Sequence, residues 1–65
     1  MPKERAEEIK EAIHQSEKLT DEEKSSSVQH IEEWVAEDEA FGILYNKLIE
    51  INIVFEEIFK ELGLV

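Results

Sequence analysis

The chain has no cysteine, one proline and two glycines among its 65 residues. Without cysteine it can form neither a disulfide nor a zinc site built on thiolates. Two isolated glycines, Gly42 and Gly63, cannot form a glycine-rich phosphate loop, and no serine has the flanking glycines of a nucleophile motif. The absence of cysteine is also common in intracellular proteins, so we expect a cytoplasmic location.

Long apolar runs are also missing. No stretch of about 18 uncharged apolar residues occurs, so we expect no membrane-spanning segment. Residues 1–8 are rich in charge and contain no apolar core of a secretory signal. A domain of about 60 residues buries little core, and small domains usually add a disulfide, a metal or an oligomer interface. With disulfides excluded, we expect a homodimer.

Basic residues are few. Seven Lys and Arg accompany 17 Asp and Glu, which gives a net charge of -10 and argues against a nucleic acid or membrane partner. Residues 20–40 carry most of this charge, because eight acids there accompany one lysine. A basic protein is therefore a possible partner of this segment. Its acidic surface is predicted at Glu32, Glu33, Glu37, Asp38 and Glu39.

Apolar residues recur at helical spacing in three segments, which predicts an all-α fold. The first helix is expected over 3–18, with Ala6, Ile9 and Ile13 on its buried face. Its other positions are mostly charged, as expected for a face in solvent.

The second helix is expected over 21–37 and begins at the clearest boundary in the chain. Thr20 and Glu23 have the spacing of a capping box, in which each side chain accepts a hydrogen bond from the other residue's backbone N–H. The buried stripe of this helix is predicted to contain Val28, Ile31 and Val35, with Trp34 closing the core at its edge.

The third helix is expected over 41–62 and is the most apolar. Steps of three and four residues over three heptads connect Phe41, Leu44, Leu48, Ile51, Phe55, Ile58 and Leu62. This stripe is widened by Ile43, Tyr45, Ile49, Ile53, Val54 and Phe59. Gly63 is predicted to end the helix, with the last two residues folding back.

The second and third helices are not expected to be continuous, because their stripes would then point about 130° apart. A break is predicted between 36 and 42. Either Asp38 is the N-cap of the third helix or Gly42 closes the second. Short connections favour antiparallel neighbours, so the predicted fold is a three-helix antiparallel bundle, completed as a homodimer through the C-terminal helix.

The predicted dimer interface lies on the C-terminal helix and consists of Leu48, Ile49, Asn52, Ile53, Phe55 and Phe59. Asn52 is the polar residue within this apolar face. It either sets the register of two packed helices, as a polar core residue can in coiled coils, or lies at the margin and reaches water.

No catalytic, cofactor or metal site is predicted, and the protein is not expected to be an enzyme. Glu11 and His14 have the spacing of a di-iron motif, but both point away from the apolar face of the first helix. His30 is one turn before Glu33 and Trp34, and we interpret it as a partly exposed histidine rather than a pH switch.

Three functional hypotheses follow from these patterns. The first is a self-associating structural or protein-interaction module. The alternative is an acidic binding protein, comparable to an antitoxin or a DNA-mimicking inhibitor, that presents residues 20–40 to a basic partner. A metal- or pH-responsive protein that uses His14 or His30 is the third.

Overall fold

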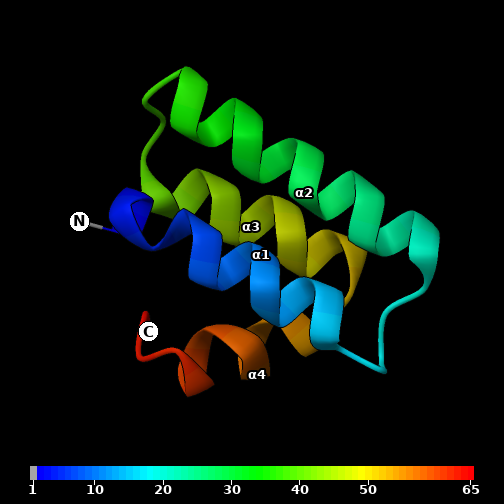
Figure 1. Cartoon of the computed structure of the whole chain (residues 1–65). Coiled ribbons are helices and arrows are strands. Elements are labelled where there is room, and N and C mark those ends of the chain that lie inside the picture. Colours follow the sequence, from blue (N-terminus) through cyan, green and yellow to red (C-terminus); the bar gives the residue numbers. More distant parts are fainter. Residues whose placement is uncertain (1) are drawn as a thin grey trace.

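A computed structural model describes residues 2–65 as a series of helices joined by short connections (Figure 1). A short 3-10 helix, η1 (Pro2–Arg5), leads into α1 (Ala6–Gln15). The chain continues through α2 (Asp21–Ala36), α3 (Phe41–Ile51) and α4 (Val54–Glu61). The part of the chain that the structure describes contains no strand, which confirms the predicted all-α class.

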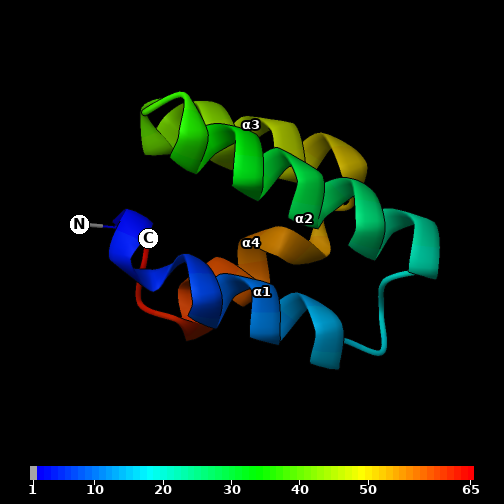
Figure 2. The same cartoon turned by 45° about the horizontal axis from the view of Figure 1, so that its top comes forward.

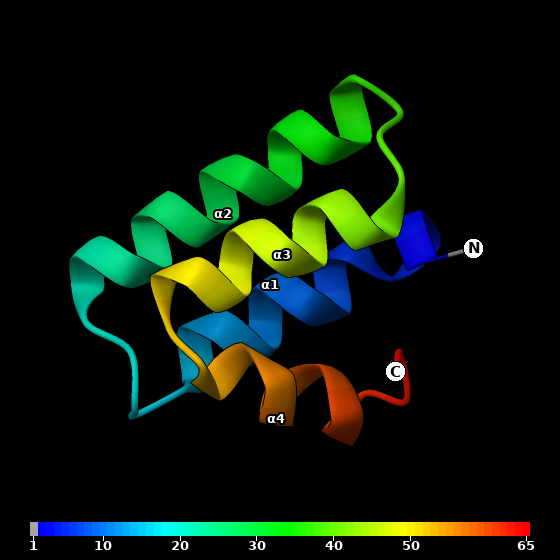
Figure 3. The same ribbon diagram turned by 180° about the vertical axis from the view of Figure 1, so that it is seen from behind.

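Successive helices run in roughly opposite directions and form two layers. Figure 2 shows α2 and α3 together in one layer, and α1 and α4 in the other. Around this arrangement α1 contacts α2 and α4, while α3 contacts the same two helices. Figure 3 shows α4 returning below α3, so the C-terminus lies near the N-terminal end of α1. Within residues 2–65, no helix has the length and apolar character needed to cross a bilayer.

The three-helix bundle is not confirmed, because the helix predicted over 41–62 is divided into α3 and α4. Asn52 separates them with an extended backbone, at φ −162° and ψ 130°. Its Oδ1 atom accepts a hydrogen bond from the Val54 N–H at 2.9 Å. An asparagine with extended backbone and this contact has the geometry of an N-cap, so Asn52 ends α3 through its backbone and caps the start of α4 through its side chain.

The start of α2 confirms the predicted capping box. The Glu23 N–H donates to the Thr20 hydroxyl at 3.1 Å, and the Thr20 N–H donates to the Glu23 carboxylate at 2.9 Å. The preceding Leu19 is buried and anchors the connection from α1. That connection begins earlier than expected, because Ser16 adopts an extended backbone and ends α1 at Gln15.

The buried face of α2 is rotated from the predicted stripe. Ser27, Ile31 and Trp34 are buried, whereas Val35 is 44% exposed and Val28 is only half-buried. Trp34 is 1% exposed, which confirms its predicted place in the core, whereas the predicted burial of Val35 is wrong. Ser27 tolerates burial because its hydroxyl donates to the Glu23 carbonyl oxygen at 2.6 Å.

The break between α2 and α3 lies where it was expected, but Asp38 is not the N-cap of α3 and Gly42 does not end α2. Asp38 adopts the left-handed conformation at φ 55°. The Glu39 N–H donates to the Trp34 carbonyl oxygen at 3.1 Å, and the Asp38 N–H donates to that of Val35 at 3.4 Å. This pair of hydrogen bonds is a Schellman motif, which usually has glycine at the Asp38 position. Gly42 lies inside α3 instead.

Aromatic rings join α2, α3 and α4 at the centre of the fold. Phe59 of α4 is the common member, with ring centroids 5.3 Å from Phe41, 5.5 Å from Tyr45 and 6.1 Å from Phe55. Phe41 in turn meets the Trp34 ring edge-on at 5.9 Å. Pairs at these distances stabilise a core beyond the burial of their area. The position of α4 therefore fixes the aromatic core.

The predicted stop at Gly63 is confirmed. Gly63 has φ +73°, and the Leu64 N–H donates to the Phe59 carbonyl oxygen at 2.9 Å. The Gly63 N–H donates to the Lys60 carbonyl oxygen at 3.0 Å. This second Schellman motif folds Leu64 back against the core, whereas Val65, which was also predicted to fold back, is 58% exposed.

The two glycines are expected to respond in opposite directions to the same change. Gly63→Ala adds a side chain to a left-handed residue and should lower the free energy of unfolding by about 1 kcal/mol. Gly42→Ala places a methyl group in open space on a helix and should raise it by about 0.5 kcal/mol. Urea unfolding followed by circular dichroism measures both. Equal effects of the two changes would contradict the assigned backbone conformations.

Candidate functional site

Acidic side chains gather at the C-terminal end of α2. Glu33 lies in the last turn, Glu37 is the C-cap, and Asp38 and Glu39 follow, while the last turn contains no basic residue. The C-terminal end of α2 is the negative end of the helix dipole, where a carboxylate is unfavourable by about 0.3–1 kcal/mol. We call Glu32, Glu33, Glu37, Asp38 and Glu39 the acidic end of α2. It contradicts the usual charge preference of helices.

The fold brings some cations to the acidic end of α2. Lys3 forms an ion pair with Asp38, and the Lys47 Nζ lies 3.7 Å from a Glu39 carboxylate oxygen. The Lys10 Nζ lies 4.0 Å from Glu32. Within α2 itself, the imidazole Nδ1 of His30 lies 3.3 Å from Glu33.

Such exposed ion pairs contribute little to the free energy of unfolding, because solvent screens them. Among residues 2–65, Glu37 has no ion-pair partner within 4 Å, and four of the five acids of this end are exposed. The end of the helix therefore keeps a negative field towards solvent.

Asp38 combines two unusual features of this end. Its backbone is left-handed at φ 55°, which is uncommon for residues other than glycine, asparagine and aspartate. The hydrogen bond from Lys3, and then the charge of Lys3, hold the pKa of Asp38 below its ordinary value of 3.8, against a small opposing effect of desolvation. A lowered carboxyl pKa contributes stability above the ordinary value, and this contribution is lost as pH falls through the lowered pKa.

The six predicted interface residues are not together on one surface. Leu48, Phe55 and Phe59 are fully buried in the core of their own chain. Ile49 and Asn52 are half-buried, and Ile53 is 65% exposed. The turn at Asn52 causes this division, because it folds α4 back over the apolar face of α3 that a second chain was expected to cover.

Asn52 also connects this turn to the beginning of the chain. Its Nδ2 atom lies 3.5 Å from the Lys18 carbonyl oxygen and 3.5 Å from the Glu23 carboxylate that belongs to the capping box. The role of Asn52 as a helix cap was not foreseen. Its signal was present in the sequence, since an asparagine followed by acids at 56 and 57 is a typical helix start.

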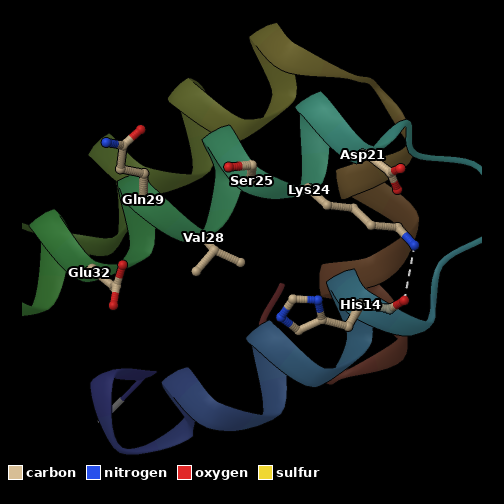
Figure 4. Close-up of a pocket in the computed structure, with 7 residues that line it drawn as sticks. All are labelled: His14, Asp21, Lys24, Ser25, Val28, Gln29 and Glu32. Carbon is tan, nitrogen blue, oxygen red and sulfur yellow. Dashed lines mark hydrogen bonds between the residues drawn. The ribbon is translucent and has the colours of Figure 1, made fainter.

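A groove between α1 and α2 lies next to the predicted exposed histidine, His14 (Figure 4). It is lined by His14, Asp21, Lys24, Ser25, Val28, Gln29 and Glu32. The Lys24 Nζ donates to the His14 carbonyl oxygen at 3.0 Å, so its charge caps the C-terminal end of α1. Glu11 accepts from the Gln15 amide at 2.9 Å. The described residues contain no group of three potential metal-ligating side chains.

Without the Lys3 ammonium, the pKa of Asp38 should no longer be lowered. In Lys3→Met the pKa of Asp38 is expected to rise towards 3.8, which NMR titration of the carboxyl group measures directly. The acid-dependent loss of stability that Asp38 causes below this value should then disappear. Lys47→Met, which removes the cation beside Glu39, is the control and should leave the pKa of Asp38 unchanged. A lowered pKa that persists in Lys3→Met would assign the shift to another group.

Comparisons with protein-family models, with curated proteins and with solved structures find no match. Two features of the chain itself bear on its function. These are the acidic end of α2 and the corner at which α3 turns into α4.

Proposed function

We propose that this protein is a cytoplasmic, non-enzymatic interaction module that binds a basic protein through the acidic end of α2. The observation that carries the proposal is the placement of Glu33, Glu37 and Asp38 at the negative end of a helix dipole. Natural sequences usually obey local rules, and departures from them concentrate at functional positions. A cationic partner would turn this unfavourable placement into a favourable one.

The chemistry of such a partner follows from the groups at this end. Arginine and lysine side chains donate charge-assisted hydrogen bonds to carboxylates, and they also donate to the last carbonyl groups of a helix. The net charge of -10 would steer a basic protein towards the chain from a distance. This long-range attraction is screened by salt, so association should slow markedly as ionic strength rises.

A charge-matched pair of triple variants tests whether the acidic end of α2, rather than net charge, makes the binding surface. Glu32→Gln with Glu33→Gln and Glu37→Gln should weaken binding of an arginine- and lysine-rich peptide by roughly tenfold at low salt. The peptide carries a fluorescent label, and anisotropy gives the dissociation constant.

The control removes three exposed acids elsewhere, at Glu17, Glu50 and Glu61. It has the same net charge and should lose much less affinity. Equal losses of affinity in both variants would mean that the peptide senses only the total charge.

The exposed side chain at the corner between α3 and α4 favours a second candidate function, self-association. Ile53 is 65% exposed and lies beside Asn52 in a surface hollow that Val54 and Lys18 also line. The half-buried Ile49 is one turn earlier on α3. Two copies that meet at this corner would cover both isoleucines, and the proposed assembly is a homodimer.

Two isoleucine variants distinguish this corner from other apolar positions. Ile53→Glu should fold, because the side chain is outside the core. It should stay monomeric at all concentrations, because it places a carboxylate in the proposed interface. Ile43→Glu, at a position 44% exposed on α3, is the matched control and should leave the mass unchanged. Light scattering after size exclusion measures the mass, and circular dichroism checks folding. A dimer that survives Ile53→Glu would remove the corner from the interface.

A further inference from the structure

The apolar residues of α3 and α4 form one continuous pattern despite the turn between them. At 100° per residue, those buried in both helices would lie within an arc of about 140° on an uninterrupted helix. These residues are Leu44, Leu48, Val54, Phe55, Ile58 and Phe59. Residues 41–62 therefore suit one straight helix as well as the hinged pair.

The hinge between the two helices is short and its own contacts are few. Only Asn52 and Ile53 separate α3 from α4. The cap from Asn52 to the Val54 N–H measures 2.9 Å, but the two contacts of the Asn52 amide with the rest of the chain are at the limit of hydrogen bonding, at 3.5 Å. Ile53 is 65% exposed and contributes little to the core. Straightening the hinge thus removes few contacts besides the cap.

Most of what holds α4 is on its other side, in the core. In the core Phe59 contacts Phe41 and Tyr45 of α3. At the surface the exposed Glu57 carboxylate of α4 lies 3.1 Å from the Lys18 Nζ. If the hinge straightened, α4 would leave behind an apolar site shaped to these rings. The ligand that fits it is another helix with Phe55, Ile58 and Phe59 at the same spacing, and a second copy of this chain supplies that helix.

We propose that two copies of this chain exchange α4. In the exchanged dimer α3 and α4 of each chain form one straight helix, and each α4 occupies the site on α1 and α3 of the other chain. This inference rests on the second proposed function, self-association, and specifies its mechanism. The same α4 contacts form in both states, so the hinge decides the balance between them, as in other domain-swapped proteins.

Exchange also reconciles the predicted interface with the closed fold. Phe55 and Phe59 are buried in the monomer and cross between chains in the dimer. Asn52 leaves its extended conformation, and Ile49 and Ile53 lie where the two straightened hinges pass each other. Residues that the closed chain divides between core and surface would then belong to one interface.

Isotope-mixed cross-linking tests the exchange in the unmodified chain. Light and ¹⁵N-labelled protein are unfolded together in equal amounts, refolded at high concentration, and separated into monomer and dimer. A carbodiimide joins Lys18 to Glu57, which belong to different elements, and Lys60 to Glu56, which lie 3.2 Å apart within α4. In the dimer about half of the Lys18–Glu57 products should pair a light with a heavy peptide, as random assembly of two copies requires.

The internal control and the alternatives give distinct results. Lys60–Glu56 products should never mix labels, because both residues are on the same helix of one chain. A dimer whose Lys18–Glu57 products are all unmixed would overturn the exchange and leave self-association standing. A chain that stays monomeric at every concentration would overturn both.

A matched asparagine pair tests the hinge itself. Asn52→Ala removes the cap that favours the closed form. The preference of each chain for the closed hinge should fall about fivefold, and because a dimer contains two hinges its dissociation constant should fall about 30-fold. Asn46→Ala makes the same change on the exposed face of α3 and should leave the dimer dissociation constant nearly unchanged. Sedimentation equilibrium measures both constants. An Asn52→Ala dimer no tighter than that of Asn46→Ala would contradict the proposal.

Discussion

The hydrogen bond between the Asn52 side chain and the Val54 N–H determines how this chain buries its most apolar segment. Without the turn, a helix over 41–62 would extend about 30 Å and leave the second half of its apolar face without a neighbour. With the turn, α4 lies against both α1 and α3. A small chain thereby obtains a core of its own without a disulfide.

The same residue brings two turns of the chain together at one end of the fold. Asn52 approaches Glu23, which is itself part of the capping box at Thr20, so the turn between α3 and α4 lies beside the turn between α1 and α2. Helix termini leave backbone groups that need partners, and this fold satisfies several of them at one place. At the opposite end of α2 the chain places carboxylates at the negative end of the helix dipole. This contrast within one helix is why we assign function to its C-terminal end.

Features written in short stretches of sequence could be predicted. The capping box at Thr20 and the stop at Gly63 each depend on residues within one turn, and both are present. The hinge at Asn52 was missed because the heptad spacing of apolar residues continues through it. A single residue with extended backbone leaves that spacing unchanged, so periodicity alone cannot indicate the break. On α2 the burial of Ile31 and Trp34 was predicted correctly but that of Val35 was not, since packing against Phe41 turns the Trp34 side of the helix towards the core.

The acidic end of α2 could be located from the sequence, but its surroundings could not. The pairing of Lys3 with Asp38 joins residues 35 positions apart, and only the packing of η1 near the end of α2 brings them together. The left-handed backbone of Asp38 was likewise hidden, because nothing in the local sequence distinguishes an aspartate N-cap from an aspartate that ends a helix.

The contact between the Phe41 and Phe59 rings gives the most direct test of the turn that organises the fold. Their centroids are 5.3 Å apart in the closed chain. In one straight helix the same residues would be about 27 Å apart along the axis. A nuclear Overhauser effect between the two rings, measured on dilute monomer, is the result we expect. Its absence, with helical chemical shifts continuing through residues 52 and 53, would contradict the account.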